Sequence, residues 1–274
     1  MRNLSWTPLL LLAACTALPL PRNATYHPSD ADLGVTRIVH GSLVIEMEQT
    51  RVLIDPWFNS GFTTRQTEPL GLLPGGLPEL SAVVITHKHA EHFDPDVLRD
   101  VAKKVPRAIG PPALADALRK LGFKDVTPLD WWDSTDIGPI RVTAVPSNHA
   151  VPENGYVLAT DRARAYFAGD TRYFDAMADI ATAFPHLDVA FLPIGGERLM
   201  GLKRTMGPAE AVEAARLLDP RRIVPIGYGA GSGSPFVWYA SDPIATFRDE
   251  AKAAGIAPDR IVVLEPGESW HYYR

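Results

Sequence analysis

Apolar positions from about residue 35 onward form short runs of strand character, separated by stretches with helical spacing. The strand-like runs lie at 35–55, where turns divide three strands, and at 82–86, 140–145, 155–160, 164–168, 188–193, 222–226 and 260–264. A further strand and helix occupy 108–121, and apolar residues three and four apart predict helices that begin near 94, 207 and 242. Strands that alternate with helices in this way predict one layered α/β domain.

The first fifteen residues have a different pattern. Arg2 precedes an apolar run that closes with Leu12-Ala13-Ala14-Cys15, which is too short to span a bilayer and is laid out like a cleaved export signal. The closing residues resemble the bacterial lipobox, in which cleavage leaves the cysteine as a lipidated first residue. Cys15 is the only cysteine of the chain, which favours acylation over a packing role. An unlipidated signal peptide and a wrongly placed start codon remain the alternatives.

These features predict three segments: a signal peptide at 1–15, a tether at 16–34 that is rich in Pro, Asn, Thr and Asp, and a folded domain at 35–274. They predict a protein of the bacterial cell envelope, anchored to the membrane by its N-terminal lipid on the periplasmic or outer-surface side. A formal net charge of −5 gives no basic footprint for DNA or RNA, so nucleic-acid partners are disfavoured.

The densest candidate chemistry lies in the stretch AVVITHKHAEHFD from Ala82 to Asp94. Four of its residues, His87, His89, Glu91 and His92, are of the types that bind zinc through nitrogen and oxygen. Off an extended segment His87 and His89 point the same way, whereas Glu91 and His92 turn toward the opposite side, so one loop could serve two adjacent ions. The alternative is a polar turn, which is disfavoured because three of the chain's 8 histidines fall within six positions.

The run His-Lys-His-Ala-Glu-His resembles the H-x-H-x-D-H motif of the metallo-β-lactamase superfamily, with Glu91 in place of aspartate. The motifs that surround it have the order found in that superfamily: Asp55-Pro56 before it, and then Asn148-His149, Gly169-Asp170-Thr171 and Met206-Gly207-Pro208-Ala209-Glu210-Ala211. Paired tryptophans at 131 and 132 are similar to a feature of one branch of the superfamily. This branch contains bacterial proteins similar to N-acyl-phosphatidylethanolamine phospholipase D and to ascorbate-6-phosphate lactonase. A core role for both tryptophans stays open. The resemblance implies a four-layer αββα sandwich with two mixed β-sheets, external helices and metals at one edge.

Residue roles also follow from the resemblance. It implies that His87, His89 and His149 hold a first zinc, that Asp170 bridges two ions, and that Glu91 and His92 bind the second. The resemblance also implies that Asp55 supports the metal-binding loop through hydrogen bonds. Gly227 stands where the superfamily has its last histidine, and Thr205 stands where phospholipase-like members often have another. We therefore expect one tightly bound ion, with a second weak or absent and with divalent metals other than zinc possible.

The sequence thus predicts an exported, lipid-anchored metal-dependent hydrolase that uses a metal-activated hydroxide. A phosphodiester of phospholipid type is the preferred substrate and a lactone or other ester is the second choice, with Asp170 and Glu91 as candidate general bases. The alternative is a degenerate member that binds a ligand without turnover. A class B β-lactamase is disfavoured because this chain has no cysteine at its second metal position. His40 and His271 are interpreted as structural, and Trp57 and Phe58 either line the cleft or cover the core.

Overall fold

The computed structural model describes residues 19–61 and 63–274. The predicted signal peptide and Cys15 therefore lie outside the described residues. Within the described residues, no helix has the length and apolar character needed to cross a bilayer.

The first sheet has seven strands in the order β18-β1-β2-β3-β5-β6-β7. Their bounds are β1 Leu33–Val39, β2 Ser42–Met47, β3 Thr50–Ile54, β5 Ala82–Val84, β6 Arg107–Gly110, β7 Asp125–Pro128 and β18 Ser269–Tyr272. β1, β2 and β3 form an antiparallel meander, and β3, β5, β6 and β7 run parallel. The sheet is therefore mixed, as predicted.

The second sheet has six strands in the order β15-β12-β11-β10-β9-β8. Their bounds are β8 Ser134–Ile137, β9 Ile140–Val145, β10 Gly155–Ala159, β11 Arg164–Phe167, β12 Val189–Pro193 and β15 Arg222–Ile226. β8 to β11 pair antiparallel, and β11, β12 and β15 pair parallel. Two smaller sheets lie beside these, one made of β13 Arg198–Leu199, β14 Leu202–Lys203 and β17 Val237–Trp238, the other of β4 Arg65–Gln66 and β16 Ala230–Gly231.

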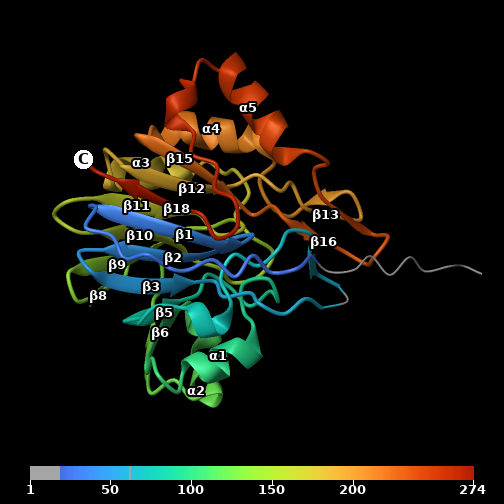
Figure 1. Cartoon of the computed structure of the whole chain (residues 1–274). Helices are drawn as coiled ribbons and strands as arrows, with labels where there is room; N and C mark the ends of the chain where they lie inside the picture. Colours follow the sequence, from blue (N-terminus) through green and yellow to red (C-terminus); the bar gives the residue numbers. More distant parts are fainter. Residues whose placement is uncertain (1–18, 62) are drawn as a thin grey trace, which may run out of the picture.

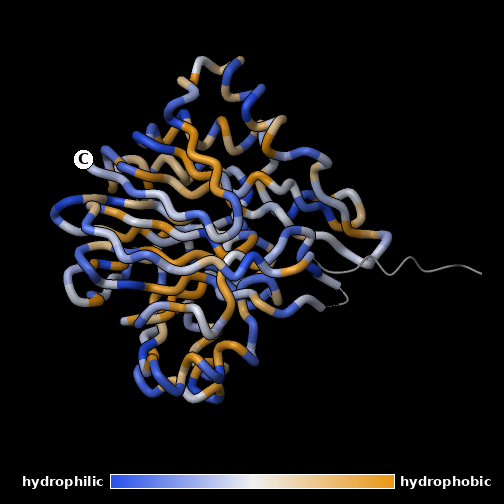
Figure 2. Tube along the Cα trace, in the orientation of Figure 1, coloured by the Kyte–Doolittle hydropathy of each residue, from blue (hydrophilic) through white to orange (hydrophobic). Residues whose placement is uncertain are grey.

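Three apolar cores lie between four layers. The central core lies between the two large sheets and joins residues such as Ile45 of β2 to Phe167 of β11. One outer core packs α1 Pro95–Val101 and α2 Ala115–Leu121 on the first sheet. The other packs α3 Met177–Ala183, α4 Pro208–Leu218 and α5 Pro243–Ala253 on the second sheet. In Figure 1 the two large sheets lie between α1 and α2 at one end of the view and α3, α4 and α5 at the other, and Figure 2 shows apolar segments, in orange, along the same strands and helices. This order is the predicted αββα sandwich.

The strand directions bring six chain segments to one edge. β1 and β3 run in the same direction because both are antiparallel to β2, so the turn after β1 and the residue after β3 lie at the same edge. β5 is parallel to β3 and adds the H-x-H-x-E-H loop there. In the second sheet β9, β11 and β12 run in one direction by the same argument, so the segments that follow them also gather at one edge. Carboxyl ends of strands from both sheets thus supply one site.

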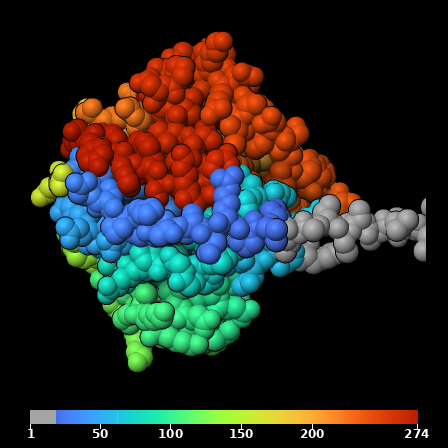
Figure 3. Space-filling model, viewed as in Figure 1, coloured from blue at the N-terminus to red at the C-terminus, as the bar shows by residue number. Residues whose placement is uncertain are grey.

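Two segments near the ends of the domain differ in detail from the sequence analysis. Residues 22–32, assigned to a tether, lie against the domain: Arg22 N donates to Leu70 O at 2.8 Å and Ala24 N donates to Gly71 O at 2.8 Å. Figure 3 shows this segment, in blue, along the surface of the domain. The strand predicted at 260–264 does not form: Arg260 ends the 3₁₀ turn η3 Pro258–Arg260, and the residues after it make one isolated bridge, between Ile261 and Ile223.

The structure also decides between the roles left open for four aromatic residues. Trp57 and Phe58 are buried in the core beneath the first sheet, so they cover the core. Trp131 and Trp132 are 49% and 44% exposed, so neither is a core residue. Trp131 Nε1 donates to Glu153 O at 3.1 Å.

Candidate metal centre

Three histidines converge at the shared edge. His87 Nε2 lies 3.0 Å from His89 Nδ1, and His149 Nε2 lies 3.1 Å from the same His89 nitrogen. His149 comes from the segment after β9, so the structure joins it to the loop after β5 as predicted. We call these three residues the first donor group.

In His87 and His149, the hydrogen-bond partner of Nδ1 decides which ring nitrogen carries the hydrogen. His87 Nδ1 lies 3.0 Å from Glu153 Oε1 and 2.9 Å from Thr86 Oγ1, and His149 Nδ1 lies 3.1 Å from Arg204 O. Because Glu153 and the Arg204 carbonyl accept hydrogen bonds, each Nδ1 carries the hydrogen and each Nε2 presents a bare lone pair. One hydrogen on His89 Nδ1 can serve only one of these two lone pairs. A cation among the three nitrogens satisfies them all, so the residues present fit a metal.

His92 and Asp170 form the centre of a second donor group. His92 Nδ1 lies 2.8 Å from Asp55 Oδ2, and His92 Nε2 faces Asp170 Oδ2 at 3.2 Å. His40, from the turn after β1, has a donor atom within 4.8 Å of donor atoms of both His92 and Asp170. All three residues are buried. The rings of His87 and His92 lie 4.2 Å apart between centroids, so the two donor groups are adjacent.

Asp55 is fixed more tightly than a surface carboxylate. Its Oδ1 accepts from Thr86 N at 2.7 Å, and its Oδ2 accepts from Thr86 Oγ1 at 2.7 Å. Its backbone has a φ of 45°, in the left-handed region that non-glycine residues seldom adopt without support from their surroundings. A carboxylate held in this way fixes the orientation of the His92 ring.

A third group consists of carboxylates. Donor oxygens of Glu91, Asp170 and Glu197 lie within 4.8 Å of one another. Burial raises the pKa of Glu91, and burial together with the charges of Asp170 and Glu91 raises the pKa of Glu197 to about 7. Three carboxyl groups at this spacing repel one another as anions, so a proton or a cation among them is favoured.

Glu153 is the counterpart of Asp55 in the first donor group. It is buried; its Oε1 also accepts from Asp170 N at 2.8 Å, and its Oε2 accepts from Ser147 Oγ. Gly169 makes this contact possible, since a Cβ at that position would lie 2.6 Å from Glu153 Oε1. Burial, reinforced by the Asp170 charge, raises the pKa of Glu153 to about 8.

The imidazoles of the first donor group are in the metal-binding form. Burial lowers the pKa of His87 well below its ordinary value, lowers that of His149, and lowers that of His89 to about 4, so all three are neutral at pH 7. His92 differs: burial acts against its charge, but Asp170 and Asp55 outweigh burial and raise its pKa well above the ordinary value. A metal ion bound to His92 would replace that proton.

The structure brings together every predicted ligand, although into separate groups. His87, His89 and His149 form one, His92 and Asp170 another, and Glu91 meets Asp170 through the carboxylates. Sequence analysis missed His40, Glu153 and Glu197. Each is a single polar residue without a spacing motif, and only their positions just after or before strands would have marked them. His271 lies in β18, paired with Gly34.

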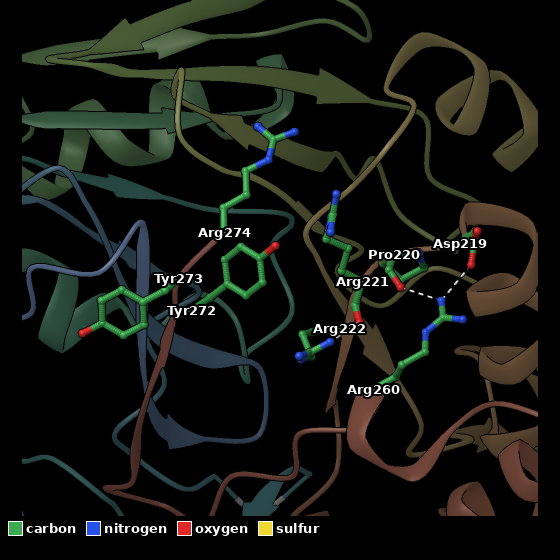
Figure 4. A pocket seen from close by; sticks show the side chains of 8 residues that line it. All are labelled: Asp219, Pro220, Arg221, Arg222, Arg260, Tyr272, Tyr273 and Arg274. Carbon is green, nitrogen blue, oxygen red and sulfur yellow. Dashed lines mark hydrogen bonds and ion pairs between the residues drawn. The ribbon is translucent and has the colours of Figure 1, made fainter.

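A cavity of about 380 Å³ lies at the opposite end of β15 (Figure 4). Its lining includes Arg221, Arg222, Arg260 and Arg274 but no histidine. Arg260 Nη2 is bonded to Asp219 Oδ1 at 2.8 Å, so part of the positive charge is already paired. This cavity is therefore separate from the candidate metal centre in place and in chemistry.

Comparison with known proteins agrees with this geometry. Residues 50–228 match the family described as Beta-lactamase superfamily domain. A UPF0173 metal-dependent hydrolase from Thermococcus onnurineus is 30% identical over 229 residues, covering 80% of this chain and 90% of that protein. Another from Pyrococcus furiosus is 28% identical, covering 86% and 97%. Igni18, a metallo hydrolase from Ignicoccus hospitalis, shares the fold with a TM-score of 0.69 and 22% identity, over 88% of this chain and 99% of that chain.

The chain belongs to the β-lactamase superfamily and has the metallo-β-lactamase fold. It is a metal-dependent hydrolase of that fold.

Proposed function

We propose that this hydrolase cleaves an amphiphilic phosphodiester or ester whose apolar part contacts a hairpin beside the metal centre. The observation that carries the proposal is an exposed apolar surface on this hairpin. Met200, Leu202 and Phe236 are 72%, 69% and 59% exposed, and Leu199 and Trp238 are also exposed. These five residues, on or beside β13, β14 and β17, are called the apolar hairpin surface. Apolar surface gathered in one place on a soluble domain is typical of a contact with lipid, protein or an apolar ligand.

Both ends of the hairpin reach the donor groups. Glu197, directly before β13, belongs to the carboxylate group, and Arg204, directly after β14, accepts the hydrogen of His149 Nδ1 through its carbonyl. A substrate that rests on the apolar hairpin surface would therefore extend toward the metal centre. This placement supports a substrate with an apolar chain on one side of its scissile bond.

The polar side of the site supplies the groups needed for hydrolysis. A zinc ion in the first donor group would lower the pKa of a bound water to about 7, which provides a nucleophile at neutral pH. Glu91, Asp170 and Glu197 lie where they could accept the proton of that water or return it to the leaving group. The charge of Arg204 acts on Glu197, His89 and His149, so it lies close enough to this site to favour a phosphoryl oxygen there.

The predicted lipid anchor fits this proposal. A lipid on Cys15 would keep the domain at a membrane surface, where phospholipid-type diesters are concentrated. Zinc is our proposal for the first donor group because three neutral imidazoles suit it. Among the ester classes, we favour the phosphodiester over the lactone because the charge of Arg204 acts on the site and because an apolar surface flanks it.

Paired substrates with short and long apolar chains test the proposal. The zinc-loaded full chain would be assayed on phosphodiesters, including phosphatidylethanolamine vesicles, and on acyl lactones. Met200→Ser with Leu202→Ser should raise KM for long-chain substrates by about tenfold, since a fully buried Leu or Met is worth about 1.5–3 kcal/mol. The same variant should leave short-chain substrates unchanged.

Tyr273→Ser provides a matched control, because Tyr273 is an exposed aromatic residue 61% accessible in the strand region that carries the arginine-lined cavity. It should leave both substrate lengths unaffected. Hydrolysis confined to short, water-soluble lactones, with no effect of the hairpin substitutions, would contradict the amphiphilic phosphodiester proposal.

A further inference from the structure

We propose that His40 replaces the histidine missing at position 227 and holds a second metal ion together with His92 and Asp170. The inference rests on the metal-dependent hydrolase function of the same site, but not on any substrate. It changes the expectation of a weak or absent second ion, which followed from the histidine missing at Gly227.

His40 is placed as a ligand would be. It occupies the turn between β1 and β2 with a φ of 54°, is buried, and has a donor nitrogen within 4.8 Å of those of His92 and Asp170. Its Nδ1 lies 3.2 Å from Tyr228 O, which can only accept a hydrogen bond. The hydrogen therefore resides on Nδ1, and Nε2 presents a bare lone pair.

That Nε2 atom is buried and has no hydrogen-bond partner among the residues at 19–61 and 63–274. A buried imidazole nitrogen without a partner costs free energy, and a bound cation would remove the cost. The ring is held on two sides, by Trp57 at 5.5 Å and by His92 at 5.4 Å between ring centroids, both edge to face. The lone pair is thus aimed by packing as well as by a hydrogen bond.

The backbone at 227 explains why the ligand comes from elsewhere. Gly227 has a φ of 71°, and a Cβ there would lie 2.9 Å from Pro193 Cβ and 3.8 Å from Asp170 Oδ1. The chain therefore still passes beside the site, but in a conformation that excludes a side chain. The next residue, Tyr228, presents the carbonyl that orients His40. The segment that lacks the ligand thereby positions its replacement.

Two imidazoles and one carboxylate form a mixed nitrogen and oxygen donor set that suits Zn²⁺, Mn²⁺ or Fe²⁺. The group of Glu91, Asp170 and Glu197 offers a competing position for the second ion, because Asp170 belongs both to this group and to the group of His40 and His92. The two positions make opposite predictions for single substitutions, so experiment can separate them.

Metal content and magnetic coupling provide readouts that do not depend on catalysis. The full chain would be loaded with Mn²⁺ and with Zn²⁺, the bound metal measured by elemental mass spectrometry across a titration, and the Mn²⁺ form examined by EPR for spin coupling between two ions. His40→Ala and His40→Asn would be compared with the double variant Glu91→Gln, Glu197→Gln. The asparagine variant keeps a donor for Tyr228 O and so guards against misfolding, which the thermal transition of the metal-free proteins would report.

We expect two ions and a coupled signal in the unchanged protein. Both His40 variants should keep one ion, lose the coupled signal, and bind the second ion at least about 100-fold more weakly, since even outer partners of a metal cost 10–100-fold. The carboxylate double variant should keep both ions. If the His40 variants retain two ions with unchanged affinity, or if the carboxylate variant alone loses the second ion, the inference is wrong. A single ion at saturation in the unchanged protein would also overturn it, while leaving the hydrolase function to the first donor group.

Discussion

The two donor groups are built alike in one respect and differently in another. Each contains a histidine oriented by a buried carboxylate, with Glu153 against His87 in the first group and Asp55 against His92 in the second. The first group takes all its ligands from two strand ends that carry recognisable motifs. The second combines His92 and Asp170 with His40, a lone histidine in a tight turn. The comparison shows that the orienting carboxylate can stay in place while the source of a ligand changes.

Removal of a ligand from the first donor group should have the largest effect. His89→Ala takes away the one nitrogen that both His87 and His149 face. We expect the tight ion to be lost and hydrolysis to fall to background, because a direct ligand contributes more than the 10–100-fold typical of an outer partner. Metal content and turnover would be measured together. A chain that still bound one ion tightly and retained its turnover would contradict the assignment.

The two orienting carboxylates should separate the ions. Glu153→Gln should weaken the first ion and Asp55→Asn the second, each by about 10–100-fold, because each change disturbs the ring orientation of one histidine. Titration of the full chain with zinc gives both dissociation constants. Asp116→Asn, at a carboxylate that is 88% exposed, serves as the control. Equal weakening of both ions by either variant would mean that the groups are not independent.

Chelation should distinguish the groups in solution. A competing chelator such as EDTA, added in increments, should remove the second ion before the first, because the second group has fewer imidazole ligands and a proton competes with the metal ion for the nitrogen of His92, whose pKa is raised. Turnover and metal content would be followed at each step. If both ions were lost at the same chelator concentration, the two donor groups would have equal affinities, and the difference in their number of imidazole ligands would have no effect.

The smallest effect is expected at Gly227. Gly227→Ala places a Cβ 2.9 Å from Pro193 Cβ and forces a non-glycine residue into the left-handed region, at a cost of roughly 1–3 kcal/mol. The free energy of unfolding of the metal-free protein should fall by about that amount in a urea titration. Gly255→Ala, at a positive φ with open space around the Cβ, isolates the backbone contribution. Gly227→His should be destabilised as well, and it should not restore a second ion when His40 is replaced by alanine.

Sequence alone predicted the layered fold and the residues of the first donor group. His149 and Asp170 could be predicted because they follow strands in a recognised order after the H-x-H-x-E-H loop. His40 could not, because a single histidine beside a glycine has no spacing that distinguishes a ligand from a core residue. Glu153 and Glu197 were missed for the same reason, since their roles depend on contacts across the two sheets.

The two differences near the ends of the domain have similar causes. The apolar run at 260–264 has strand composition, yet only Ile261 forms a bridge to a neighbouring strand, and that run is mostly half-buried. Residues 22–32 have no periodicity, and they join the domain through individual backbone bonds and the Tyr26 contact with Glu46. The local sequence pattern predicts neither the missing strand nor the contacts of residues 22–32, because both depend on pairing with distant segments.

The most direct test of the two-group centre is the number of ions bound per full chain and their separate dissociation constants, measured with Zn²⁺ and Mn²⁺ in protein purified without chelator. The account predicts two ions at saturation, the tighter one lost in His149→Ala and the weaker one lost in His40→Ala. A chain that binds no ion under these conditions, or binds two that respond identically to both substitutions, would contradict it.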